Sequence, residues 1–560
     1  KKSIKSSLLP IYSSTETLST RGITNKLIRE FISNIFEKSS KDFKESLNQN
    51  INEKYGMITK YEALYNVHFP ISQTLLSKAL FRLKYEEFFY IQLQFLFKNI
   101  YNKNKFKGFN FSKVGNNFNT FYNDHLEFKL TSAQKRVIKD IRKDFSSNAQ
   151  MNRLLQGDVG SGKTIVALLS SLIAIDNDFQ TCLIAPTEIL AQQHFSSINE
   201  SLSKIDLNVK ILTGSTSKKD RVILFEELKN GVVDILIGTH AVLENNVIFK
   251  NLGFAIIDEQ HRFGVAQRSK LWKKNLTPPH ILVMTATPIP RTLAMSVYGD
   301  LDISIIDELP PGRKLVKTVH RTDRNRLEVF NFIRNEISKG RQVYIVYPLI
   351  EESKTMDYKD LMDGYESIVR EFPIENYQIS ILHGRMKPND KAFEMERFKN
   401  GKTQIMVSTT VIEVGVNIPN ASVMIIESSE RFGLSQLHQL RGRVGRGSES
   451  SFCILMSKNK LSNEARTRIK TMTSTNDGFK ISEVDMKLRG PGNLLGTQQS
   501  GLLNFKIADI IKDKDILEFS RADAKELVIS DPELKFNENK EIKDEYNLLN
   551  KNSNFWKHIS

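Results

Sequence analysis

Cysteine is almost absent from this chain of 560 residues: only Cys182 and Cys453 occur, and both lie in apolar runs, TCLIAP and SFCILM. Two such cysteines argue against a disulfide framework or a thiolate zinc site, so we expect buried, reduced thiols. No apolar run approaches the roughly 18 residues that a membrane span requires. The basic start KKSIKSSLLP also lacks the apolar core of a signal peptide. We therefore expect a cytoplasmic protein with no membrane partner, and a start at Lys1 instead of Met is compatible with a fragment of a longer chain.

Charge of one sign dominates the composition. The chain carries 80 Lys and Arg against 64 Asp and Glu, a formal net charge of +16. Residues 1–130 alone hold 20 basic and 11 acidic residues. A clustered positive field attracts phosphates and favours a polyanionic partner such as nucleic acid. Lysine overuse in an AT-rich genome is the alternative, and the uneven distribution of charge favours the functional interpretation.

Hydrophobic periodicity divides the chain into four ranges. Residues 1–120 show helical spacing and predict a helical N-terminal region. Residues 121–305 and 306–458 alternate short β-branched runs with helical patterns, which predicts two tandem α/β domains with parallel sheets and flanking helices. DELPPGRK, residues 307–314, has the Pro-Gly punctuation of a linker. Residues 459–560 predict a small helical domain, interrupted by the glycine-rich LRGPGNLLGTQQSG, and a C-terminal tail.

GDVGSGKT matches the G-x-x-x-x-G-K-[ST] phosphate loop and precedes an apolar helical pattern. Such a loop aims backbone N–H groups at phosphates at a helix N-terminus. Lys163 is expected to reach the β- and γ-phosphates, and the Thr164 hydroxyl to bind Mg²⁺. The predicted nucleotide-binding residues are Gly157, Asp158, Val159, Gly160, Ser161, Gly162, Lys163 and Thr164.

An adjacent carboxylate pair ends the strand-like run FAII. Asp258 is expected to hold Mg²⁺, and Glu259 to polarise the attacking water, because phosphoryl transfer needs positioning and charge neutralisation. The alternative is an exposed acidic loop after a core strand. Gln260 and His261 follow the pair and are predicted to sense the γ-phosphate. The hydroxyls of Thr285 and Thr287, in the TATP turn, could accept that signal; ordinary turn chemistry is the alternative.

A P-loop domain alone could belong to a kinase, a transporter ATPase or a GTPase, and the second α/β block decides among these classes. In QLRGRVGRG, Arg443 and Arg446 lie three residues apart and are suited to reach across a cleft as arginine fingers. Fingers of this kind contribute roughly 10³ to 10⁵ in rate in related phosphoryl transfer. A solvated basic patch is the alternative.

An ordered set of motifs resembles the superfamily 2 helicases. The set comprises AQ at Ala133 and Gln134, GDVGSGKT, APTEILAQQH, LTGS, GTHA, DEQHRFG, TATPIPRTLA, HGRM, STTVIEVGVNIPNA and QLHQLRGRVGRG. DEQHRFGVAQR, DELPPGR, LIEES and LRGPGNLLGTQQSG narrow the resemblance to the RecG family of branch-migration helicases. It covers roughly residues 7 to 532.

The resemblance implies two RecA-like domains that bind ATP and Mg²⁺ between them and move along duplex DNA, remodelling stalled replication forks and Holliday junctions in recombination and repair. It implies a monomer and allows contact with a single-stranded DNA-binding protein. Gln134 matches the glutamine that reads adenine. Four residues match segments that touch the DNA backbone: Thr187, Gly238, Thr239 and Thr409. Arg489, Gln498 and Gln499 fall in the translocation motif that couples cleft closure to DNA movement.

Three departures from the family pattern stand out. Asn417 replaces a common acid, and Gln498 replaces a common arginine, which puts in doubt an interlobe contact and the coupling to translocation. The N-terminal wedge domain is not visible as a complete β-rich domain, so we expect a chain that lacks all or most of it. Two alternatives remain, a duplex translocase resembling the transcription-repair coupling factor and a non-unwinding DNA-binding ATPase remnant.

Overall fold

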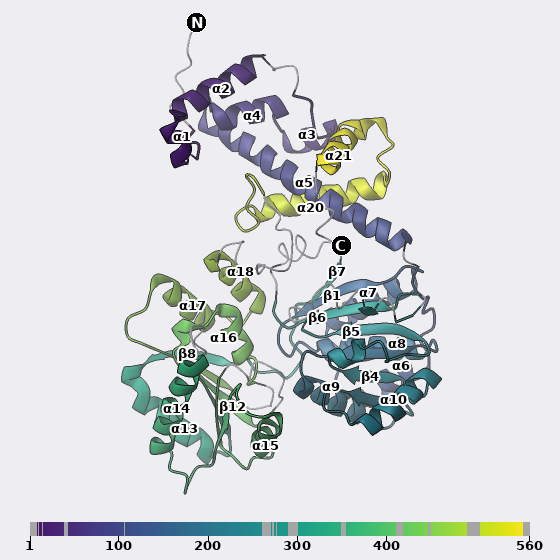
Figure 1. The fold of residues 1–560 in the computed structure, drawn as a ribbon, viewed down its shortest axis with the longest axis vertical. Coiled ribbons are helices and arrows are strands. Elements are labelled where there is room, and N and C mark those ends of the chain that lie inside the picture. Colours follow the sequence, from purple (N-terminus) through teal and green to yellow (C-terminus); the bar gives the residue numbers. More distant parts are fainter. Residues whose placement is uncertain are drawn as a thin grey trace. The chain divides into compact units, whose positions relative to one another are not determined.

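The computed structural model (Figure 1) describes residues 8, 10–13, 15–38, 43–105, 107–259, 270–271, 274–275, 277–288, 290, 301–348, 354–409, 418–445, 450–489 and 505–552. Chain contacts divide it into two units. The larger unit spans Lys103–Pro290 and Leu301–Leu488 and contains both parallel sheets. Among the described residues, no helix combines the length and apolarity needed to cross a membrane.

The first lobe of the larger unit is a seven-stranded parallel sheet in the order β3-β4-β2-β5-β6-β1-β7. Its strands are β1 (Asn152–Gly157), β2 (Gln180–Ile184), β3 (Val209–Leu212), β4 (Ile235–Gly238), β5 (Leu252–Ile257), β6 (His280–Thr285) and β7 (Asp302–Ile306). Its helices are α6 (Asn116–Thr120), η1 (Phe121–His125), α7 (Ser132–Phe145), α8 (Lys163–Ile175), α9 (Glu188–Ser201), α10 (Lys218–Asn230) and η2 (His240–Leu243). Parallel strands need helical crossovers, which is why the apolar strand runs alternate with helices.

The second lobe is a six-stranded parallel sheet in the order β10-β11-β9-β12-β13-β8. Its strands are β8 (Lys317–Thr322), β9 (Gln342–Val346), β10 (Ile379–Leu382), β11 (Ile405–Ser408), β12 (Ala421–Ile426) and β13 (Phe452–Ser457). Its helices are η4 (Asp323–Asn325), α13 (Arg326–Ser338), α14 (Lys354–Glu371), α15 (Pro388–Lys399), η6 (Ser429–Arg431), α16 (Leu434–Arg441), α17 (Asn463–Ser474) and α18 (Gly478–Arg489).

Strand β12 shows why this sheet is buried on both faces. Val423 and Ile425 join one apolar cluster, and Met424 and Ile426 join another. Because successive side chains point to opposite faces of a strand, a continuous apolar run supplies both cores. The sequence prediction of two tandem α/β domains with parallel sheets is thus confirmed.

The smaller unit is helical and joins the two ends of the chain. It contains the described parts of Lys1–Asn102 and Arg489–Ser560. Its elements are α1 (Glu16–Thr20), α2 (Asn25–Lys38), α3 (Gln49–Tyr55), α4 (Lys60–His68), α5 (Gln73–Lys105, which continues into the larger unit), α20 (Lys514–Ser530), η7 (Asn537–Asn539) and α21 (Lys540–Asn552). Helices α5, α20 and α21 lie together (Figure 1), and their apolar residues share one buried cluster.

Polar contacts fix the two ends of the chain to each other. The Asp523 carboxylate on α20 accepts hydrogen bonds from Tyr55 at 2.8 Å and Tyr85 at 2.6 Å, and pairs with Lys54 at 2.6 Å. Glu87 on α5 accepts the backbone N–H groups of residues 506–508. The sequence predicts 1–120 and 459–560 as separate regions. In the structure most of both ranges belongs to one unit, because segments far apart in the sequence contact each other.

Candidate active site

Three neighbouring strands of the first lobe end where the candidate residues lie. The order β5-β6-β1 places the acid pair after β5, the TATP turn after β6 and the phosphate loop after β1. The register pairs Gln156 with Thr285 and Ile257 with Val283. Ligands of open parallel sheets bind at the carboxyl ends of the strands. The sheet topology thus brings three separate sequence motifs to one edge.

The phosphate loop has the backbone conformation its glycines predict. Gly160 and Gly162 have φ of 72° and 85°, a left-handed conformation that glycine adopts without steric cost. Lys163 begins α8, and its Nζ donates to the carbonyls of Gly157 at 2.7 Å and Asp158 at 2.9 Å. Burial lowers the pKa of Lys163, while the charges of Glu259, Asp258 and Asp158 oppose that change.

The residues present fit a nucleotide with Mg²⁺. Gly160 and Gly162 both have a positive φ, where a side chain would be strained, and a Cβ at these positions would also meet Arg313 Nη1 and Gln134 Nε2. Ser161 Oγ is buried and makes no hydrogen bond within the described part of the chain. A carboxylate at 258 and a hydroxyl at 164 are the hard oxygen donors that Mg²⁺ prefers.

The two acids of the pair differ in environment. Asp258 is buried, and its Oδ2 lies 2.8 Å from Nε2 of His194 on α9. Burial raises the pKa of Asp258, but the hydrogen bond and charge of His194, together with Lys163, bring it below its ordinary value. Burial and the neighbouring Asp258 raise the pKa of Glu259, which Lys163 and Arg443 partly oppose. One acid is therefore held ionised, and the other is more basic than usual.

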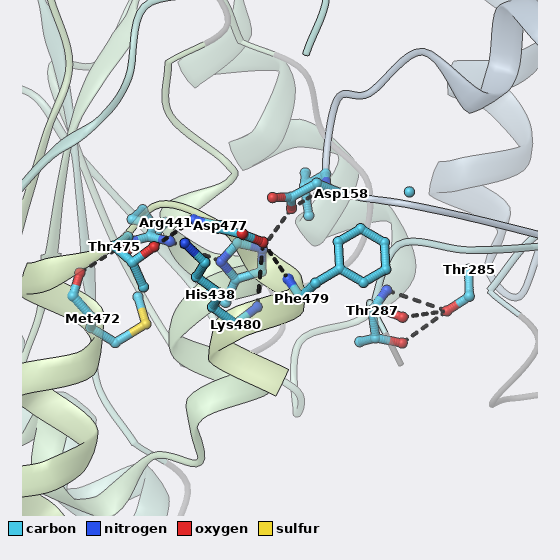
Figure 2. A network of polar contacts seen from close by, with 12 residues as sticks. Asp158, Thr285, Thr287, His438, Arg441, Met472, Thr475, Asp477, Phe479 and Lys480 are labelled. Carbon is cyan, nitrogen blue, oxygen red and sulfur yellow. Dashed lines mark hydrogen bonds and ion pairs between the residues drawn. The ribbon is translucent and has the colours of Figure 1, made fainter. Parts of the chain in front are cut away.

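Backbone geometry at Glu259 is unusual for a non-glycine residue. Its φ is 53°, in the left-handed region, where a bulky side chain is strained by about 1 to 3 kcal/mol. Its Oε2 lies 3.5 Å from the Ala286 backbone N–H in the TATP turn. The hydroxyls of Thr285 and Thr287 lie 2.8 Å apart (Figure 2). The turn thus contacts the acid pair through a backbone N–H, and its two hydroxyls bond within the turn.

Gln134, in the first turn of α7, contacts the phosphate loop. Its Oε1 accepts the Thr131 N–H at 2.9 Å in a capping box, and its Nε2 donates to Ser161 O at 2.9 Å. A primary amide has a second donor hydrogen and further acceptor capacity. Gln134 can therefore hold the loop and still recognise a base.

The second lobe reaches the phosphate loop through the end of α16. His438 Nε2 lies 2.5 Å from Asp158 Oδ1, and His438 Nδ1 lies 3.0 Å from Arg441 Nη2 (Figure 2). Arg441 also donates to the carbonyls of Met472 at 2.9 Å and Thr475 at 2.8 Å. Arg443, directly after α16, is buried, and its charge lowers the pKa of Glu259.

The candidate DNA contacts lie in both lobes. Thr187 caps α9, Gly238 ends β4, and Thr239 and Thr409 follow β4 and β11. The hydroxyls of Thr239 and Thr409 are buried and have no partner among the described residues. Arg489 is the last residue of α18. Six further residues lie outside the described part of the chain, namely Gln260, His261, Asn417, Arg446, Gln498 and Gln499.

Four site residues were not singled out from the sequence: His194, Arg313, His438 and Gly478. A Cβ at Gly478, the first residue of α18, would lie 2.6 Å from His438 Nε2, 2.7 Å from Pro288 Cγ and 3.0 Å from Asp158 Oδ2. The motifs APTEILAQQH, DELPPGR and QLHQLRGRVGRG contain the first three. Their contacts could not be inferred because each partner is more than 60 residues away.

A phosphate loop and an acid pair at one sheet edge, with a second parallel-sheet lobe after them in the chain, are the architecture of two-lobed P-loop proteins of the helicase class. Family models agree with this class: residues 131–296 match the DEAD/DEAH box helicase model, and 327–448 match the helicase conserved C-terminal domain. A third match covers residues 475–560 and is described as ATP-dependent DNA helicase RecG, domain 3, C-terminal.

The chain belongs to the RecG family. It is 45% identical to the ATP-dependent DNA helicase RecG of Synechocystis sp. over 96% of this chain and 63% of that protein. Against the RecG of Thermotoga maritima, identity is 44% over 94% and 66%, and against that of Bacillus subtilis, 43% over 96% and 78%. The chain thus spans less than two thirds of the first two relatives. A structure of RecG bound to a three-way DNA junction matches with a TM-score of 0.67 and 43% identity, covering 91% of this chain and 66% of that one.

Proposed function

We propose that this chain is an ATP-dependent double-stranded DNA translocase and helicase that remodels stalled replication forks and Holliday junctions in recombination and repair. The observation that carries the proposal is the gathering of Lys163 and the acid pair Asp258 and Glu259 at one edge of the first sheet, where His438 of the other lobe bonds the phosphate loop at Asp158. Family membership supports branched DNA as the substrate, since the related RecG structure holds a three-way junction. Neither alternative is favoured, because residues 475–560 match the RecG domain 3 model.

The proposed chemistry assigns one task to each group. Thr164 and Asp258 would hold Mg²⁺, which supplies charge neutralisation at the phosphates when bound. Glu259 orients and polarises the attacking water, and its raised pKa suits a proton acceptor. Arg443, with Arg446, supplies positive charge from the second lobe. Gln260 and His261 are proposed as phosphate sensors, and Gln134 as the adenine contact.

Movement along DNA requires that closure of the two lobes changes their contacts with the nucleic acid. Thr187, Gly238, Thr239 and Thr409 are proposed backbone contacts, and Arg489, Gln498 and Gln499 are proposed coupling residues. We place the protein in the cytoplasm as a monomer with access to a single-stranded DNA-binding protein. The two cysteines are free and buried, and burial raises the pKa of each to about 12, so both thiols are poorly reactive.

The test is the ATPase rate with no nucleic acid, single-stranded DNA, duplex DNA, a model fork and RNA, at one stated salt concentration. Strong stimulation by the fork or the duplex is expected. Glu259→Gln is the matched control, since it should still bind ATP while turnover falls by orders of magnitude. Stimulation by RNA alone, or none by any DNA, would overturn the proposal.

A further inference from the structure

The linker between the lobes is fastened to the first lobe at its start. Glu308 Oε2 accepts the backbone N–H of Ala133 at 3.1 Å, and Asp307 pairs with Arg136 at 2.8 Å. Both partners lie in α7, beside the candidate adenine contact Gln134. The linker therefore starts as part of the nucleotide-binding lobe.

A Pro-Gly turn then fixes the direction of the chain. Arg313 N–H lies 3.4 Å from Pro310 O, with Pro311 and Gly312 in the central positions. Gly312 has φ of 84°. Proline followed by a glycine with positive φ is the pattern of a type II turn. The fixed φ of Pro311 and the hydrogen bond that closes the turn restrict the backbone conformation, and this determines the direction of the chain at Arg313.

That direction brings the Arg313 guanidinium onto the phosphate loop. Arg313 Nη1 donates to Val159 O and lies so close to Gly160 that a Cβ there would clash with it. Burial lowers the pKa of Arg313, which the charge of Asp158 opposes. Lys163 donates to the two preceding carbonyls of the loop, Gly157 O and Asp158 O.

Two cations thus converge on three consecutive carbonyls of one loop. Arg313 also lowers the pKa of Lys163, as expected of like charges close together. The hydrogen bonds that the two cations make within the described part of the chain all go to these carbonyls. Carbonyl groups are weaker partners for a buried cation than a charged oxygen is. The group that would satisfy both cations is a multiply charged anion bound to the loop.

We propose that Arg313 binds the phosphates of the nucleotide as a second cation beside Lys163, supplied by the linker and separate from the arginine fingers of the second lobe. This inference rests on the proposed function, because it requires that the chain binds ATP. A guanidinium presents two parallel N–H groups to phosphate oxygens, which a lysine cannot do. The chain directly after the linker packs into the second lobe, since Val316 belongs to its apolar cluster and a Cβ at Gly445 would lie 2.8 Å from Val316 Cγ2. Phosphate binding at Arg313 therefore acts on the segment that joins the lobes.

The test measures ATP and ADP affinity by calorimetry, without DNA, for the wild type, Arg313→Gln, Arg313→Lys and Lys314→Gln. Lys314 is the matched control, because it is exposed and its replacement removes the same charge from the residue directly after the turn. Loss of a charge-assisted bond should weaken ATP binding by roughly tenfold or more in Arg313→Gln. Arg313→Lys should recover part of the loss, and Lys314→Gln should stay within about twofold of the wild type.

Thermal unfolding separates phosphate binding from linker anchoring. An Arg313→Gln variant that melts earlier but binds ATP as tightly as the wild type would overturn the inference, because Arg313 would then only hold the linker. Lys163→Ala reports on the proposed function itself. Loss of binding in Lys163→Ala together with normal binding in Arg313→Gln would overturn the inference alone, and a wild type that binds no ATP would overturn both.

Discussion

The hydrogen bond between His438 and Asp158 predicts a measurable coupling between the two lobes. Arginine can only donate, so Arg441 makes His438 Nδ1 an acceptor and leaves the proton on Nε2, which donates to Asp158. The two side chains are only 6% and 19% exposed, so solvent screens the bond little. A hydrogen bond to a charged group contributes about 1.5 to 3 kcal/mol, a factor of roughly 10 to 150 in the equilibrium between closed and open lobes.

The assay is a double-mutant cycle on DNA-stimulated ATP turnover, with His438→Ala, Asp158→Ala and the double variant. His438→Ala should reduce turnover about tenfold or more, and the double variant should be little worse than the poorer single variant. His320→Ala is the control, because His320 bonds Ser457 within the second lobe at 2.8 Å and does not need the first lobe. Energies that add within about 0.5 kcal/mol would mean that the contact carries no coupling, and the reasoning would be refuted.

Three further predictions concern other contacts. His194→Ala removes the partner that orients Asp258, so the Mg²⁺ concentration for half-maximal ATPase should rise about 10-fold or more; an unchanged Mg²⁺ titration would exclude that role. Burial lowers the pKa of His280 from 6.5 to about 4, so the unfolded chain takes up the proton at a higher pH than the folded chain. The stability of the first lobe should therefore fall by up to about 3 kcal/mol as the pH drops from 6.5 to 4. Hydrogen exchange of the β6 amides in the wild type and His280→Gln tests this, since a pH dependence of stability that survives the substitution has another origin. Asp523→Ala leaves two tyrosine hydroxyls without their acceptor and should cost the helical unit about 2 to 4 kcal/mol in urea unfolding; a loss below about 0.5 kcal/mol would show that water replaces the carboxylate.

Local sequence rules account for the sheets and for the conformation of the phosphate loop. The loop follows because G-x-x-x-x-G-K-T places glycine at 160 and 162, where φ is positive. The strands follow because parallel sheets buried on both faces need continuous apolar runs such as ASVMII. The position of Asp258 also follows, since acids after a neighbouring parallel strand reach the same edge of the sheet.

Contacts between segments far apart in the chain could not be predicted from the sequence. The pairing of Asp523 with Tyr85 joins residues 438 positions apart, and helical periodicity in each segment does not specify the partner. The same holds for Asp158 and His438, which are 280 positions apart. A histidine in a helix is usually a satisfied core or surface residue, so only the folded arrangement distinguishes His438 from an ordinary one.

Several of these long-range contacts involve the residues between Gly157 and Gly162, the two glycines that the phosphate-loop motif specifies. Phosphate binding uses backbone N–H groups and Lys163, so the motif leaves the side chains at 158 and 159 free for other contacts. In this chain Asp158 meets His438, a Cβ at Gly442 would lie 2.7 Å from Val159 Cβ, and Val159 O accepts from Arg313. A shift of the loop on nucleotide binding must therefore move contacts to both the second lobe and the linker. We therefore expect coupling between nucleotide binding and the second lobe to depend on the residues at the x positions of G-x-x-x-x-G-K-T. A match to this motif does not specify these residues.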